Sequence, residues 1–210
     1  MSEVKIAVLV SGGGTNMQAI KKEIEKGNIN GRIEIVISSN EKAFALERAA
    51  KYGIEGIYIG KNNYSDVHKR TEAILEILEK KEIQLIVLAG YMSILENSFI
   101  ERYKNRIINI HPALIPSFCG KGYYGQKVHQ AVLDYGAKVS GATVHFVDEG
   151  TDTGPVILQE AVEVKDDDTV ETLAARVLEA EHRLLPKAVK LFCEGKLVVE
   201  GRKVRILTNK

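Results

Sequence analysis

The sequence predicts an α/β fold, a doubly wound and mostly parallel sheet with an antiparallel C-terminal extension. Two observations support this prediction. Short apolar runs alternate with helical patterns throughout residues 1–110, which is typical of parallel strands joined by crossover helices. After Pro112 the pattern changes, and two longer strand-like runs follow each other with only a polar loop between them.

The strands of the first part are short apolar runs, as expected for buried parallel strands. The helices between them carry apolar residues at helical spacing, as in the helix with Met17 and Ile20 that ends at Gly27. The predicted strands are residues 5–10, 33–38, 56–59, 84–89 and 106–110, and the other predicted helices are residues 43–52, 64–80 and 97–103.

The second part begins with a Gly- and Tyr-rich loop, residues 117–125, which leads into a helix through Val128 and Val132. Residues 140–147 and 156–164 are the two longer runs. Polar and apolar residues alternate in the first of them, which predicts an antiparallel strand with one exposed face.

The last segment is expected to hold one long helix and a hairpin. Thr169 is expected to cap the helix, Pro186 to kink or restart it, and Gly195 to end it. Residues 196–206 are expected to form the hairpin around Gly201.

The composition excludes several classes of protein. The 210 residues suit one domain, residues 1–210, with halves at 1–110 and 111–210. Lys+Arg 29 against Asp+Glu 28 leaves no excess charge for nucleic acid or membranes, and two cysteines are too few for a disulfide scaffold or a four-ligand zinc site. No apolar run reaches the roughly 18 residues of a membrane span, and the N-terminus does not have the pattern of a signal peptide. We therefore expect a soluble, cytoplasmic protein with a single domain.

The first candidate site is the glycine loop after the first strand, where Ser11-Gly-Gly-Gly-Thr-Asn16 opens a helix. Backbone N–H groups at a helix start favour an anion, and glycines let a phosphate approach the backbone. The loop matches neither the dinucleotide fingerprint nor the Walker loop, so a single phosphate fits better. A tight strand-to-helix turn that binds nothing is the alternative.

The second candidate site is the end of the strand at residues 106–110. Asn109 and His111 are two residues apart, so on a strand both point to the same side. The amide can stabilise an oxyanion, and the imidazole can exchange a proton near neutral pH. Asp152, in the polar loop between Gly150 and Gly154, can approach them and would raise the pKa of the imidazole. A strand-end histidine bonded to backbone and an ordinary turn aspartate are the alternatives.

Several segments together resemble the folate-dependent formyltransferases. The Asn-x-His-Pro-x-Leu-x-Pro element is specific for that group, and the glycine loop narrows the resemblance to the phosphoribosylglycinamide formyltransferases. The resemblance covers residues 4–200. The segments that carry it are Val10–Asn16, Leu88–Met92, Asn109–Pro116, Asp152–Ile157 and Glu181-His182.

The resemblance implies a Rossmann-like formyltransferase fold and formyl transfer from 10-formyltetrahydrofolate to the amine of glycinamide ribonucleotide. Asn109, protonated His111 and Asp152 would be catalytic, and no metal would be required. Gly13, Gly14, Thr15 and Asn16 would bind the phosphate, and Glu181 the ribose. The implied folate-binding residues are Leu88, Met92, Ser93, Ile94, Leu95, Ile107, Val147 and Glu149. The partners would be these small molecules, with no nucleic acid and no membrane, in a monomer or homodimer.

Two features depart from the family pattern. Ser93 stands where many relatives carry Arg, which affects the contacts at the folate mouth. Loop 117–125 is longer than in some members, and it is either a surface loop or a lid over the ribonucleotide. The alternative functions are a formyltetrahydrofolate deformylase, with water as acceptor, and a non-catalytic sensor of a phosphorylated ligand.

Overall fold

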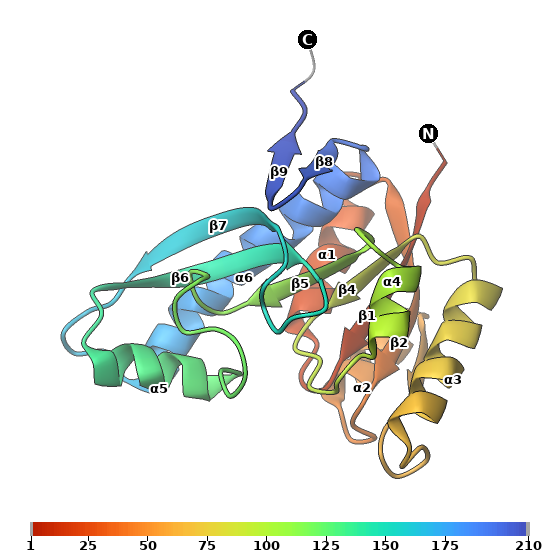
Figure 1. Cartoon of the computed structure of the whole chain (residues 1–210), viewed down its shortest axis with the longest axis horizontal. Coiled ribbons are helices and arrows are strands. Elements are labelled where there is room, and N and C mark those ends of the chain that lie inside the picture. Colours follow the sequence, from red (N-terminus) through yellow and green to blue (C-terminus); the bar gives the residue numbers. More distant parts are fainter. Residues whose placement is uncertain (1, 209–210) are drawn as a thin grey trace. The chain divides into compact units, whose positions relative to one another are not determined.

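The computed structural model describes residues 2–208 (Figure 1). The chain folds as two compact units, residues 1–108 and residues 109–210. The strand β5 (Ile107–His111) carries the chain from the first unit into the second. The prediction that both halves belong to one domain stays a prediction.

The first unit contains the parallel part of the sheet. Its strands are β1 (Val4–Val10), β2 (Gly31–Ser38), β3 (Glu55–Tyr58) and β4 (Leu85–Leu88), in the order β3-β2-β1-β4. All three pairings are parallel, with Val10 opposite Ser38 and Leu9 opposite Leu88 at the carboxyl ends. These ends meet at one edge of the sheet, which is where ligands bind in open α/β sheets.

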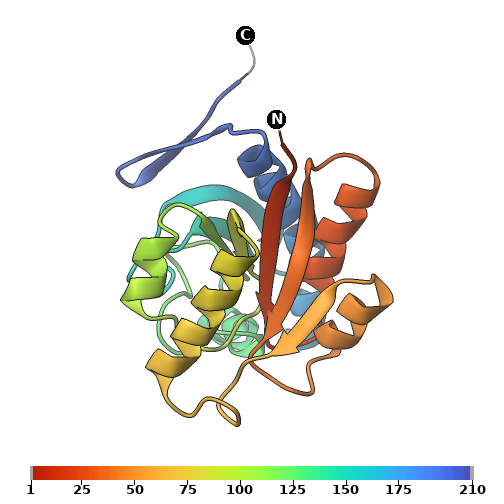
Figure 2. The same cartoon turned by 90° about the vertical axis from the view of Figure 1, so that its right-hand side faces the viewer.

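Helices cover both faces of this part of the sheet. They are α1 (Thr15–Glu25), α2 (Phe44–Lys51), α3 (Val67–Lys80) and α4 (Asn97–Arg102). Figure 2 shows α1 and α2 on one side of the strands and α3 and α4 on the other. This confirms the doubly wound arrangement. Helix α3 begins three residues later than predicted because Asp66 caps it, accepting a hydrogen bond from the Lys69 N–H.

The second unit contains the antiparallel extension. Strands β6 (Val139–Phe146) and β7 (Val156–Glu163) pair antiparallel, as predicted. Strands β8 (Leu197–Glu200) and β9 (Lys203–Ile206) form the predicted hairpin, and β9 pairs with β7. Helix α5 (Gln126–Tyr135) and the long helix α6 (Val170–Cys193) complete the unit, and α6 packs on β6 and β7.

One prediction about this unit is wrong, and a second is neither confirmed in full nor contradicted. Strand β6 is buried on both faces except at Val139, because α6 covers one face and the polar side chains of the other make internal hydrogen bonds. Of the two outcomes expected at Pro186, a restart does not occur, because helix α6 continues through this residue to Cys193, and a kink stays a prediction. Pro186 is itself buried, and tertiary packing of that face outweighs the missing N–H. Thr169 does cap α6, through a capping box with Thr172.

Candidate active site

The carboxyl end of β5 presents Asn109 and His111 in the second unit. The strand ends at His111, directly before Pro112, as the missing N–H of proline predicts. The side chain of His111 is 5% exposed, and Asn109 is half-buried. Two polar groups withdrawn from water therefore share one strand end.

Asp152 contacts both of these residues. Its Oδ1 accepts a hydrogen bond from Nδ2 of Asn109 at 3.5 Å, and its Oδ2 lies 3.5 Å from Nδ1 of His111. The Gly120 N–H donates to Oδ2 at 3.0 Å. Asp152 has a φ of 58°, a left-handed conformation, in a loop that Thr153 closes by donating to Asp148 at 2.5 Å. The structure thus brings together the three residues proposed from the sequence, without any movement of the loop.

His145 is a fourth member of this cluster, and the sequence did not predict it. Its side chain is 2% exposed, its Nδ1 lies 2.8 Å from the Phe146 carbonyl, and its Nε2 lies 3.1 Å from Nδ2 of Asn109. A carbonyl only accepts, so Nδ1 carries the ring hydrogen and Nε2 accepts one from Asn109. Both N–H bonds of the Asn109 amide therefore have an acceptor, His145 and Asp152. The alternation of β6 puts Thr143 and His145 on one face, but alternation alone does not distinguish a solvent-exposed polar face from a buried one.

Two opposing effects determine the pKa of His111. Burial lowers this pKa below its ordinary value, and the nearby Asp152 carboxylate raises it by less. The Asp152 carboxylate therefore acts on this pKa in the expected direction, but in the free chain removal from water outweighs the attraction. Nε2 donates to the Phe118 carbonyl at 2.9 Å, so Nδ1, facing Asp152, is the nitrogen that gains and loses a proton.

Asp152 itself stays ionised. Burial acts to raise the pKa of this carboxyl group, but the polar groups around it, which include the Gly120 N–H, together lower it below its ordinary value. A carboxylate is thus held beside a neutral imidazole. That arrangement is suited to stabilising an imidazolium formed during a reaction.

The glycine loop lies in the first unit and is tightly built. Gly14 precedes α1 with a φ of 75°, and a Cβ there would lie 2.7 Å from the Cβ of Ala45. Two separate constraints, backbone conformation and space, therefore require glycine at this position. Ser11 Oγ accepts from the Met92 N–H at 2.7 Å, which ties the loop to the segment after β4.

The remaining proposed ligand-binding residues differ in exposure. Glu181 is buried in α6. Among the proposed folate-binding residues, Leu88 and Ile107 are buried, Ser93, Leu95 and Val147 are half-buried, and Met92, Ile94 and Glu149 are exposed. Within residues 2–208, no group of three or more His, Cys, Asp or Glu side chains has the arrangement of a metal site.

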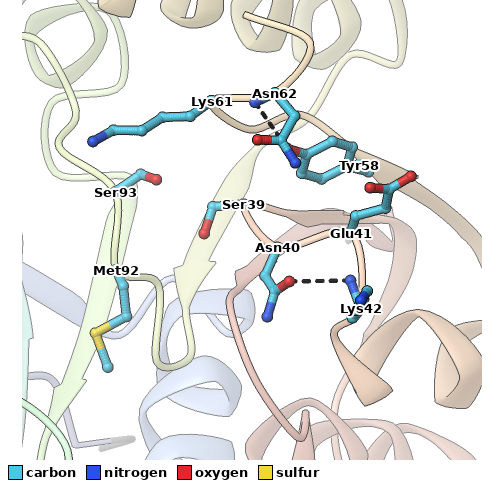
Figure 3. A pocket seen from close by; sticks show the side chains of 9 residues that line it. All are labelled: Ser39, Asn40, Glu41, Lys42, Tyr58, Lys61, Asn62, Met92 and Ser93. Carbon is cyan, nitrogen blue, oxygen red and sulfur yellow. Dashed lines mark hydrogen bonds between the residues drawn. The ribbon is translucent and has the colours of Figure 1, made fainter. Parts of the chain in front are cut away.

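Met92 and Ser93 line a pocket of the first unit with a volume of about 410 Å³ (Figure 3). Its other walls come from the segments after β2 and β3. There the Lys42 N–H donates to Asn40 Oδ1 at 3.0 Å, and the Asn62 N–H donates to the Tyr58 hydroxyl at 3.1 Å. The charged residues of this lining are Glu41, Lys42 and Lys61.

Comparison with known proteins decides the family. The sequence model described as "Formyl transferase" matches residues 4–189. The chain belongs to the formyl transferase family. A phosphoribosylglycinamide formyltransferase of Haemophilus influenzae is 39% identical to this formyl transferase over 92% of this chain and 89% of its own length. The chain therefore belongs to the phosphoribosylglycinamide formyltransferase group of the family.

Two further relatives agree with this assignment. One of them is a crystal structure of glycinamide ribonucleotide transformylase 1 from Symbiobacterium toebii. It is 44% identical to this formyl transferase with a TM-score of 0.93, and the match covers 98% of this chain and 95% of the Symbiobacterium toebii chain. A chloroplastic phosphoribosylglycinamide formyltransferase of Vigna unguiculata is 40% identical over 92% of this chain. The chain spans 62% of the length of that plant relative. No helix within residues 2–208 is long and apolar enough to cross a membrane.

Proposed function

We propose that this formyl transferase moves the formyl group of 10-formyltetrahydrofolate to the amine of 5'-phosphoribosylglycinamide, a step of purine biosynthesis. The observation that carries the proposal is the contact of Asp152 with both Asn109 and His111 at one strand end. This cluster combines a hydrogen-bond donor for an oxyanion with a neutral base and a carboxylate.

The acceptor amine attacks the formyl carbon, and the carbonyl oxygen becomes an oxyanion. Asn109 donates to that oxyanion, and the longer of its two bonds, to Asp152, is the one that gives way. Nδ1 of His111 takes the proton that the amine loses, and Asp152, directly or through a water, stabilises the imidazolium. Collapse of the intermediate breaks the bond from the formyl carbon to N10 of the folate, which leaves with that proton.

The ribonucleotide phosphate binds at the glycine loop in this proposal. Gly13, Gly14, Thr15 and Asn16 offer backbone N–H groups at the start of α1, where the helix dipole favours negative charge. Glu181 accepts hydrogen bonds from the ribose hydroxyl groups. A ligand with one phosphate suits a loop that lacks the Walker and dinucleotide patterns.

The folate co-substrate binds along the residues assigned to it from the family resemblance, with no metal required. Exposed Met92 and Ile94 offer apolar surface for its aromatic part. Folates also carry glutamate carboxylates, and the cationic residue Lys61 belongs to the pocket that Met92 and Ser93 line. In this proposal Lys61 supplies the positive charge that an arginine provides at the position of Ser93 in many relatives. We place the enzyme in the cytoplasm, as a monomer or homodimer that binds neither nucleic acid nor membranes.

A turnover assay tests the proposal. The protein is incubated with 10-formyltetrahydrofolate, with and without glycinamide ribonucleotide, and loss of the formyl group is followed by absorbance. Turnover only in the presence of the ribonucleotide supports the transferase. Turnover with water alone indicates the deformylase, and ribonucleotide binding without any turnover indicates the sensor.

A further inference from the structure

The glycine loop is held from one side by α2. The Ala45 N–H donates to the Gly12 carbonyl at 3.1 Å, and Nε of Arg48 donates to the Gly13 carbonyl at 2.8 Å. The close approach of Gly14 to Ala45 adds direct packing. Two consecutive carbonyl groups of the loop therefore face the same helix.

This arrangement determines where the loop amides point. In a planar trans peptide, the carbonyl of one residue and the N–H of the next point in opposite directions. With the Gly12 and Gly13 carbonyls turned toward α2, the N–H groups of Gly13 and Gly14 face away from it. These are two of the donors assigned to the phosphate.

The side chain of Arg48 is itself fixed. Its Nη1 donates to Oε1 of Gln18 at 2.6 Å, and its guanidinium carbon lies 4.9 Å from the ring centroid of Phe44. Gln18 in turn donates to the Tyr52 hydroxyl at 2.9 Å. A planar guanidinium with two acceptors and an aromatic ring has little freedom to leave the Gly13 carbonyl.

We infer that Arg48 is the positioning residue of the phosphate loop. Its hydrogen bond to the Gly13 carbonyl fixes the peptide whose N–H, on Gly14, meets the phosphate of the acceptor. This inference rests on the proposed function, because it concerns the binding of a phosphorylated acceptor amine. Arg48 acts through the backbone and does not touch the substrate.

The test compares two acceptors, glycinamide ribonucleotide and the same riboside without its phosphate. For Arg48→Met, kcat/KM with the ribonucleotide should fall about tenfold, as for loss of one charge-assisted hydrogen bond, mainly through KM. The value with the riboside should not change. Lys51→Met is the matched control, because Lys51 lies over the same Phe44 ring at 5.7 Å without bonding to the loop. It should leave both values unchanged.

The outcomes separate this inference from the proposed function. Equal losses with both acceptors, or no loss, would show that Arg48 has only a structural role or none, and would overturn the inference. If the wild-type protein uses both acceptors equally, the glycine loop does not bind the phosphate. If the wild-type protein transfers no formyl group to either acceptor, the proposed function is refuted. If Arg48→Met does not fold, the same two acceptors are compared with Arg48→Lys. A lysine cannot bond to Gly13 and Gln18 together, so we expect about a threefold loss confined to the ribonucleotide.

Discussion

Nδ2 of Asn109 lies 3.1 Å from Nε2 of His145, and this contact fixes the direction in which the Asn109 amide faces. His145 can accept that hydrogen bond only because its own Nδ1–H donates to the Phe146 carbonyl. The proposed oxyanion donor is therefore oriented by a second buried side chain, in the way that outer groups orient catalytic ones in other sites.

The first prediction concerns the orientation of Asn109. His145→Gln keeps an acceptor at the ε position, whereas the shorter amide of His145→Asn can replace the Nδ1 donor but has no group at the ε position. We expect kcat to fall about tenfold in His145→Asn, the size of one lost hydrogen bond, and to stay within about threefold in His145→Gln. Steady-state kinetics measures both, and equal losses in the two variants would show that the Nε2 acceptor is not what matters.

The second prediction concerns Asn109 itself. Asn109→Ala removes the donor for the oxyanion, and we expect kcat to fall about 100- to 1,000-fold, as in other enzymes that lose one such donor. Binding of the ribonucleotide, measured by calorimetry, should not change, because the phosphate loop is untouched. A loss of kcat of less than about tenfold would count against the assigned role.

The third prediction concerns the proton on His111. Because burial lowers its pKa, His111 should titrate below its ordinary value of about 6.5 in the free protein, as measured from ring resonances by NMR. The Asp152 carboxylate raises this pKa, so Asp152→Asn should move the titration to still lower pH. His68, whose pKa Glu96 raises, is the internal control and should titrate above that value in both proteins. An upward shift of His111 in Asp152→Asn would contradict the account.

The fourth prediction concerns the space around Gly14. Gly14→Ala introduces both left-handed strain and a clash with Ala45, whereas Gly27→Ala, at a φ of 74° with open space, introduces the strain alone. We expect Gly27→Ala to lower the free energy of unfolding by about 1 kcal/mol and Gly14→Ala by clearly more. Urea unfolding measures the difference. Similar values for the two variants would mean that the loop moves away from α2 at little cost.

The sequence predicted the parallel strands and their helices well because burial and helical spacing leave direct patterns in it. It placed Asn109 and His111 correctly because strand alternation is a local property. It did not predict the burial of Thr143 and His145, since their partners are groups distant in sequence, such as the Ala113 carbonyl and Asn109. The sequence indicated that Asp152 raises the pKa of His111, but not that burial outweighs this effect, because burial depends on the folded surroundings.

The central claim is that the formyl group passes to the ribonucleotide amine and not to water. The most direct measurement follows 10-formyltetrahydrofolate labelled with ¹³C in the formyl group, in the presence of glycinamide ribonucleotide, by NMR. We predict that the label appears in the formamide carbon of the formylated ribonucleotide at the rate at which the folate loses it. Appearance of the label in formate would contradict the claim.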